Sequence, residues 1–170
     1  MNWHLRNGAI PTFFYDVRTA TGEPNAYERI LAEAKKTIRI WDPYFDPDKC
    51  AQLFKKVKTE NIRIEILSSF KKEQEKMEMG KMLDNICTVL KKNITHCKLT
   101  AFIYDKANWH DRFLIIDEDE PTQVVYLVGA SMDAQTQRTK SHGIGTIVDK
   151  DDAALIITKY TTYRNVAPAD

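Results

Sequence analysis

Cysteine is scarce in this chain, and the cysteines that occur have neither the number nor the spacing of a structural framework. The sequence of 170 residues holds three, Cys50, Cys87 and Cys97. An odd number of cysteines without metal-ligand spacing argues against a disulfide scaffold and against a zinc site. We therefore expect free thiols in a reducing compartment, the cytoplasm.

Long hydrophobic runs and an excess of one charge are also missing. No apolar run reaches the length of a transmembrane helix, and residues 1–6 lack the hydrophobic core of a secretion signal. The 25 basic and 24 acidic side chains give a formal net charge of +1, so a site for a polyanion needs a local cluster. The sequence contains no glycine-rich phosphate loop and no calcium loop. We expect no membrane insertion, and no metal or other cofactor.

What is present is the composition of an ordinary globular protein. Hydrophobic residues make up 43% and charged residues 29% of the chain, which suffices for one compact domain with a full core. Residues 1–24 contain scattered glycines and prolines and are expected to form an irregular lead-in, with room for a short strand at 12–16. Residues 1–170 are therefore expected to form a single domain.

Apolar spacing predicts strands alternating with helices in the first half of the chain and neighbouring strands in the second. The clearest strand alternates Ile62, Ile64 and Ile66 with charged residues. Helices are expected at 27–36, 46–58, 72–92 and 151–164, and strands at 37–44, 62–68, 99–104, 113–117, 124–128 and 143–148. This order favours an α/β fold, a mixed β-sheet flanked by helices on both faces.

One stretch concentrates the chemistry of the chain. His110 and Arg112 precede an apolar run of four residues that is followed by Asp117, and residues two apart on a strand project from the same face. An imidazole beside a guanidinium suits a phosphate ester, because the cation binds the non-bridging oxygens while the imidazole attacks phosphorus. Asp117 either orients this site or caps the end of the strand. The plainer alternative is that three common surface residues lie near a strand by chance.

Three segments of the chain resemble the phospholipase D superfamily, whose signature is His-x-Lys-x4-Asp followed by Gly-Ser-x-Asn. His110, Arg112 and Asp117 match the first part at the right spacing, with arginine in place of lysine. Residues 125–131 resemble the strand that leads into the second part. Residues 30–45 resemble the first helix and strand of the family.

The resemblance extends over about residues 25–165 and implies a phospholipase D-like fold with metal-independent phosphodiester chemistry. In that family one histidine forms a phosphohistidine and a second histidine protonates the leaving group. This chain holds a single motif, as do small bacterial nucleases of the family. The resemblance therefore implies a homodimer, in which His110 of each copy supplies nucleophile and acid in turn.

The chain departs from the family signature at three positions. Arg112 keeps the positive charge and can grip phosphate bidentately, although its fork is larger than an ammonium group. Ala130 and Met132 stand where the family has serine and asparagine. Ser131 and Asp133 lie one residue further on and can substitute only if the loop shifts. The phosphate-binding half of the expected site is therefore better kept than its catalytic support.

Further residues near the motif extend the expected substrate site. His142 stands near the place where single-motif nucleases have a glutamate facing the nucleophile, and it is either a donor to phosphate or an ordinary loop histidine. Trp109 either walls the pocket or is a core aromatic. Arg138 and Lys140 either track a nucleic-acid backbone or lie in a solvated loop. Residues 42–45 end a strand where α/β folds place ligands, but a strand-to-helix turn is the favoured interpretation.

The sequence leaves an enzyme and a binding module open. The favoured function is a phosphodiesterase acting on nucleic acid, a nuclease with His110 as nucleophile or acid. Nucleic acid is preferred to lipid because the chain is short and lacks an interfacial helix with a basic face. The alternatives are a catalytically degenerate module that binds nucleic acid, another phosphate ligand or a protein, and a lipid phosphodiesterase. A chain of this size also fits one subunit of a larger bacterial assembly.

Overall fold

Nine helices and strands make up the described part of the chain. A computed structural model describes residues 26–69, 84, 88, 97–104, 110–130, 132 and 143–167. In chain order the elements are α1 (Ala26–Glu33), β1 (Thr37–Trp41), α2 (Pro47–Phe54), β2 (Arg63–Ser68), β3 (Lys98–Ile103), β4 (Phe113–Ile116), β5 (Val124–Val128), β6 (Ile144–Thr146) and α4 (Lys150–Val166). The expected lead-in at 1–24 lies outside the described residues, as does the expected helix at 72–92 apart from Asp84 and Thr88, which are helical.

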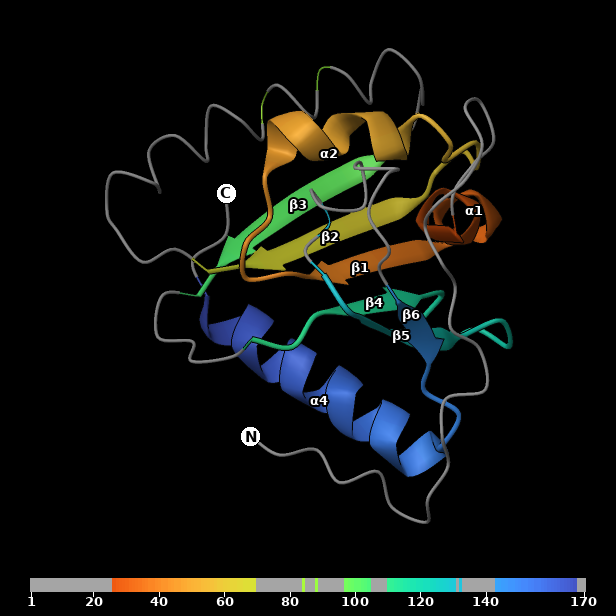
Figure 1. Cartoon of the computed structure of the whole chain (residues 1–170), viewed down its shortest axis with the longest axis vertical. Helices are drawn as coiled ribbons and strands as arrows, with labels where there is room; N and C mark the ends of the chain where they lie inside the picture. Colours follow the sequence, from red (N-terminus) through yellow and green to blue (C-terminus); the bar gives the residue numbers. More distant parts are fainter. Residues whose placement is uncertain are drawn as a thin grey trace.

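The strands form one six-stranded sheet in the order β3-β2-β1-β4-β5-β6. β1, β2 and β3 run parallel to one another, as expected for strands joined through helical segments. β4 is antiparallel to β1, β5 to β4 and β6 to β5, so the second half of the sheet is a series of neighbouring antiparallel strands. The expected α/β fold with a mixed sheet is confirmed (Figure 1).

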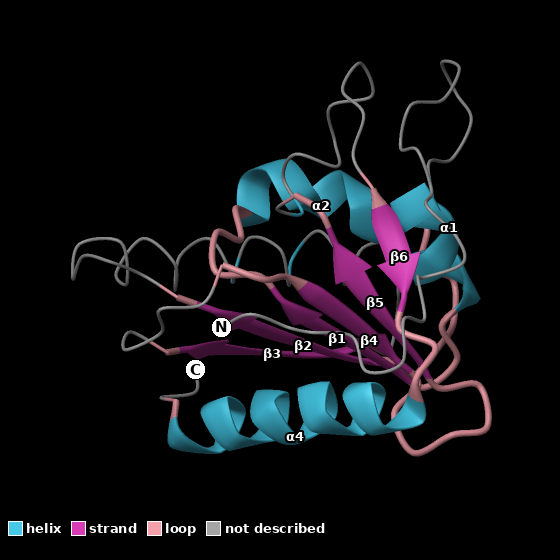
Figure 2. Ribbon diagram, turned by 60° about the horizontal axis from the view of Figure 1, so that its bottom comes forward, coloured by secondary structure: helices cyan, strands magenta, loops and turns pink. Residues whose placement is uncertain are grey.

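Helices cover both faces of this sheet, with α1 and α2 on one face and α4 on the other (Figure 2). The buried residues accordingly form two cores. Ile38 and Ile40 of β1 belong to the core shared with α1 and α2. Trp41 belongs to the second core, which contains Ile156 and Tyr160 of α4. Successive residues of a strand point to opposite faces, so one strand supplies both cores.

A buried cluster of charged residues ties α4 to the sheet. The Glu65 carboxylate lies 3.0 Å from Nε of Arg39 and 3.2 Å from Nη1 of Arg164, and it accepts a bond from the Tyr160 hydroxyl at 3.5 Å. Arg39 also pairs with Glu118, and its guanidinium lies 5.5 Å from the centre of the Tyr160 ring. Burial, and then the Glu65 carboxylate, raise the pKa of the Tyr160 hydroxyl, so this group stays protonated and donates. The buried Glu65 carboxylate is thus matched by the buried Arg39 and by the partly buried Arg164.

The first helix ends earlier than the sequence predicts, at Glu33 instead of residue 36. The backbone amides of Lys35, Lys36 and Thr37 donate to the side chain of Asp117. These amides therefore do not extend the helical ladder, and the chain turns directly into β1.

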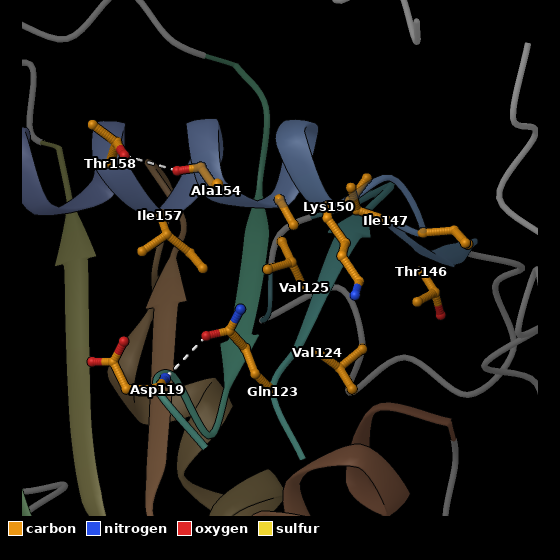
Figure 3. Close-up of a pocket in the computed structure, with 12 residues that line it drawn as sticks. Asp119, Gln123, Val124, Val125, Thr146, Ile147, Lys150, Ala154, Ile157 and Thr158 are labelled. Atoms are coloured by element: carbon orange, nitrogen blue, oxygen red, sulfur yellow. Dashed lines mark hydrogen bonds between the residues drawn. The ribbon is translucent and has the colours of Figure 1, made fainter. Parts of the chain in front are cut away.

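A pocket of about 570 Å³ lies on the α4 face, between α4 and the side of the sheet that carries β5 and β6 (Figure 3). Its lining is mostly apolar and includes Val125, Ile147 and Ile157. In the turn between β4 and β5, the side-chain oxygen of Gln123 accepts a hydrogen bond of 3.0 Å from the backbone amide of Asp119. The lining does not include His110 or Arg112.

Among the helices that the structure describes, none is long and apolar enough to cross a membrane.

Candidate active site

His110 and Arg112 lie at the edge of the sheet where β1, β2 and β3 end. Because β4 runs antiparallel to β1, the residues that precede β4 meet the residues that follow β1. The chain leaves β1 toward β2 and β3 and returns to β4 on the other side of β1. Such a reversal of strand order is where open α/β sheets bind ligands.

The register of the β1–β4 pair explains which side chains meet. The last pair of the ladder joins the end of β1 to the start of β4. Continuing this register by one and by three residues opposes Asp42 to Arg112 and Tyr44 to His110. Asp42 and Tyr44, which follow β1, therefore face Arg112 and His110, which precede β4, just beyond the end of the ladder.

The ring of His110 lies against Tyr44. The Tyr44 hydroxyl oxygen is 3.2 Å from Nδ1 of His110. The two rings are nearly stacked, with centroids 6.4 Å apart and an interplanar angle of 23°. Within the described part of the chain Nδ1 has a partner and Nε2 has none, and His110 is exposed, so Nε2 is the nitrogen open to a substrate.

Arg112 is held by three groups of the same edge. Its Nε lies 3.6 Å from the Asp42 carboxylate, and its Nη1 donates to the backbone carbonyl of His110 at 3.2 Å. The guanidinium carbon lies 5.3 Å from the centre of the Tyr44 ring, in the geometry of a cation–π contact. The guanidinium is thus held at the Tyr44 ring, which also contacts the imidazole of His110, and a guanidinium is a suitable ligand for phosphate oxygens.

Asp42 joins three strand ends. Its side chain is only 3% exposed. One carboxylate oxygen accepts the backbone amide of Tyr44 at 2.9 Å, and the other accepts the backbone amide of Met132 at 2.5 Å. With the contact to Arg112, this carboxylate connects the end of β1, the start of β4 and the segment that follows β5. Asp42 is therefore a buried hydrogen-bond acceptor that holds these three segments, and with them the site, in place.

Asp117 lies at the opposite end of β4 from His110, so the structure does not bring it together with His110 and Arg112. Its carboxylate accepts the amides of Lys35, Lys36 and Thr37 at 2.7–3.1 Å and the Thr122 hydroxyl at 3.0 Å. Burial by itself would raise the pKa of the Asp117 carboxyl, but these donors outweigh it and lower the pKa. The structure thus supports the other interpretation of Asp117, a residue that caps the strand's end.

Six residues of the expected substrate site lie outside the described residues. They are Trp109, Ser131, Asp133, Arg138, Lys140 and His142. Their roles remain predictions. Of the three departures from the family signature, Met132 has its side chain in the core shared with α1 and α2. The position that holds asparagine in the family thus serves packing here, while its backbone amide binds Asp42.

Asp42 and Tyr44 lie in residues 42–45, for which the sequence favours a strand-to-helix turn and offers a ligand site as the alternative. A turn does follow β1, and it carries both residues to the candidate site. The signal that could have identified them is their position at the carboxyl end of a buried strand, with the same spacing as His110 and Arg112. Using it would have required knowing that β1 pairs with β4.

The arrangement can bind a phosphate through Arg112 and attack it through His110. Among the described residues, no group of three or more histidine, cysteine, aspartate or glutamate side chains is placed to hold a metal ion. Arg112 offers a fixed cation, and Nε2 of His110 offers a lone pair when Nδ1 carries the proton. The chemistry that these groups favour is attack on a phosphorus atom.

Comparisons with known proteins agree with this architecture. The family model described as "Cardiolipin synthase, PLD-like domain" matches residues 27–162. The solved structure of NucT from Helicobacter pylori has a similar fold, with 14% sequence identity, a TM-score of 0.50, and a match that covers 83% of this chain and 86% of that one. No curated protein matches the sequence significantly.

A second solved structure is that of TrmBL2, described as an archaeal chromatin protein with a novel mode of DNA binding. It matches with 21% identity and a TM-score of 0.49, over 82% of this chain and 47% of that one, so this chain spans about half its length. The family assignment rests on the family model, which spans most of the chain, and on the mixed sheet. This chain belongs to the family of phospholipase D-like domains.

Proposed function

We propose that this protein is a metal-independent phosphodiesterase that cleaves nucleic acid through His110. The observation that carries the proposal is that His110 and Arg112 lie together at this end of the sheet and both contact Tyr44. Nδ1 of the imidazole is hydrogen-bonded to the Tyr44 hydroxyl, and Nε2 has no partner among the described residues. The family of the domain supports phosphodiester chemistry.

The proposed reaction has two steps. In the first, Nε2 of His110 attacks phosphorus, a phosphorus–nitrogen bond forms, and the bond from phosphorus to the leaving oxygen breaks. A second, protonated imidazole gives its proton to that oxygen. In the second step this imidazole takes a proton from water, the water oxygen bonds to phosphorus, and the phosphorus–nitrogen bond breaks. Arg112 binds the non-bridging oxygens throughout.

The second imidazole is His110 of another copy of the chain in this proposal. One chain carries a single motif, whereas the two steps need two histidines. A two-fold axis beside the exposed His110 would supply the same residue twice. Light scattering is expected to show a dimer in solution, and a protein that is monomeric while active would contradict this part of the proposal.

Nucleic acid is the proposed substrate because the site offers an aromatic surface beside its cation. Tyr44 is 41% exposed although it contacts both His110 and Arg112. An exposed ring next to a phosphate-binding cation is suited to a nucleotide, whose base can stack while its phosphate is bound. A cytoplasmic location and a place in a larger bacterial assembly remain predictions.

Cleavage assays in EDTA test the proposal. Single-stranded and double-stranded DNA and RNA are incubated with the wild type, with His110→Ala, and with His96→Ala as the matched control for losing a histidine. We expect cleavage by the wild type and the control, and a loss of at least about 10³-fold in His110→Ala at the same oligomeric state. Cleavage that needs added metal, or that His110→Ala retains, would contradict the proposal.

A second candidate function is a binding module without catalysis. It is favoured by the contact of Arg112 with Asp42 at 3.6 Å, which offsets part of the charge that a phosphate would meet. In that case the wild type would bind oligonucleotides without cleaving them, and Arg112→Ala would weaken binding. Hydrolysis of phospholipid vesicles instead of oligonucleotides would identify a lipid phosphodiesterase.

A further inference from the structure

The Tyr44 side chain contacts both His110 and Arg112. Its hydroxyl oxygen lies 3.2 Å from Nδ1 of His110, and its ring lies 5.3 Å from the guanidinium carbon of Arg112. The backbone amide of Tyr44 donates to the buried Asp42 carboxylate at 2.9 Å, which fixes the start of the turn that carries the ring. The side chain is therefore placed from a rigid strand end.

We propose that Tyr44 is a positioning residue that selects the reactive nitrogen of His110 and holds Arg112 next to it. Its hydroxyl oxygen accepts a hydrogen bond from the N–H group at Nδ1. The proton of the neutral imidazole therefore stays on Nδ1, and the lone pair is on Nε2. Its ring supports the guanidinium through a cation–π contact. The inference rests on the proposed function for its kinetic consequences, but not for the state of the free imidazole.

A hydroxyl group is suited to this position for two reasons. It accepts from Nδ1–H in the neutral imidazole and in the imidazolium, so one contact serves a histidine that acts as nucleophile and a histidine that acts as acid. A phenol also adds no negative charge beside the phosphate. The buried Asp42 carboxylate is engaged by Arg112 and by the amides of Tyr44 and Met132.

The two contacts of Tyr44 can be separated by substitution. Tyr44→Phe removes the hydroxyl and keeps the ring, so it releases Nδ1 while the support of Arg112 remains. Tyr44→Leu removes both. Because Tyr44 is 41% exposed, neither change opens a buried cavity, and both variants are expected to melt close to the wild type. Tyr163→Phe, on α4, is the matched control for losing a phenol.

Nitrogen-15 NMR of the free protein tests the tautomer without any substrate. In the wild type and in Tyr163→Phe, neutral His110 is expected to carry its proton on Nδ1. In Tyr44→Phe the signals are expected to shift toward the mixture of tautomers seen in free imidazoles. A wild-type ring protonated on Nε2, or a tautomer that Tyr44→Phe leaves unchanged, would overturn the proposal whether or not the protein has activity.

Kinetics on whichever oligonucleotide the wild type cleaves tests the rest. Tyr44→Phe is expected to lower kcat by about a hundredfold with KM little changed. Tyr44→Leu is expected to raise KM as well, because Arg112 loses its support. Equal kcat in Tyr44→Phe and the wild type would overturn the positioning role. The NMR experiment can also succeed in a protein that cleaves no oligonucleotide. That result would contradict the proposed function and leave the contact between the Tyr44 hydroxyl and His110 established.

Discussion

Asp117 illustrates how one residue of a signature can act far from the chemistry. It is 1% exposed and its backbone is in the left-handed region, with a φ of 51°. Asp is among the few residues that adopt this conformation at modest cost. Its carboxylate binds the amides that join α1 to β1 and the Thr122 hydroxyl of the following turn. Asp117 therefore fixes the end of β4 that points away from His110.

Asp117→Ala is expected to destabilise the protein by about 3 kcal/mol, because three partly buried amides and the Thr122 hydroxyl lose their acceptor. Asp117→Asn keeps one acceptor oxygen and tolerates the left-handed backbone, so it is expected to cost less than half as much. Urea unfolding measures both, with Glu120→Ala in the same exposed turn as control. Two variants of equal stability would contradict the role given to the carboxylate.

The pH dependence of stability follows from the same contacts. The pKa of the Asp117 carboxyl is lowered in the folded protein, so the folded state binds the proton less tightly than the unfolded state does. The stabilisation is therefore present in full above the pKa of the unfolded state and is lost as pH falls through the folded pKa. Unfolding free energy is expected to fall less steeply in acid for Asp117→Ala than for the wild type.

The residue that follows β5 and the residue that precedes β6 are in close backbone contact. The Gly129 amide donates to the Gly143 carbonyl at 2.8 Å, and a Cβ atom added at Gly129 would lie 3.0 Å from that same carbonyl oxygen. The partner is backbone, which cannot rotate away as a side chain can. The glycine that the family signature has at this position is thus required by packing, whatever its part in the chemistry.

Gly129→Ala is expected to destabilise the protein by about 1 to 3 kcal/mol, because the added atom forces the two backbones apart. Thermal melting measures the effect, with Leu127→Ala as a control at a partly exposed position of the same strand. An alanine variant as stable as the wild type would show that the Gly143 backbone yields without cost.

The attachment of α4 depends on the buried cluster around Glu65. Removing this carboxylate leaves Arg39 and Arg164 without one of their partners and the Tyr160 hydroxyl without its acceptor. Glu65→Ala is expected to cost about 3 kcal/mol, and Glu65→Gln less, because the amide oxygen still accepts. The midpoint of urea unfolding measures both, with the exposed Glu60→Ala as control. A cost below about 0.5 kcal/mol for Glu65→Ala would mean that the cluster does not hold α4.

At the scale of the whole molecule, the sequence sufficed for the fold and for choosing His110 and Arg112 as candidate site residues. Alternating isoleucines and helical spacing are local signals, so β2, α4 and the mixed sheet between helices could be predicted. Tyr44 and Asp42 could not, because Tyr44 meets His110 across 66 residues of sequence and Asp42 meets Met132 across 90. Those contacts depend on the pairing of β1 with β4, which no local pattern specifies. The role of Asp117 was undecided for the same reason, since its partners lie some 80 residues earlier.

In the proposed function, His110 is the residue that bonds to phosphorus. Its most direct test is intact-mass spectrometry of the wild type and of His110→Ala, denatured in alkali early in the cleavage of an oligonucleotide in EDTA. We expect a nucleotide-sized adduct on the wild type and none on His110→Ala, which is expected to be inactive. Cleavage by His110→Ala at the wild-type rate, or an adduct that maps to another residue, would contradict the account.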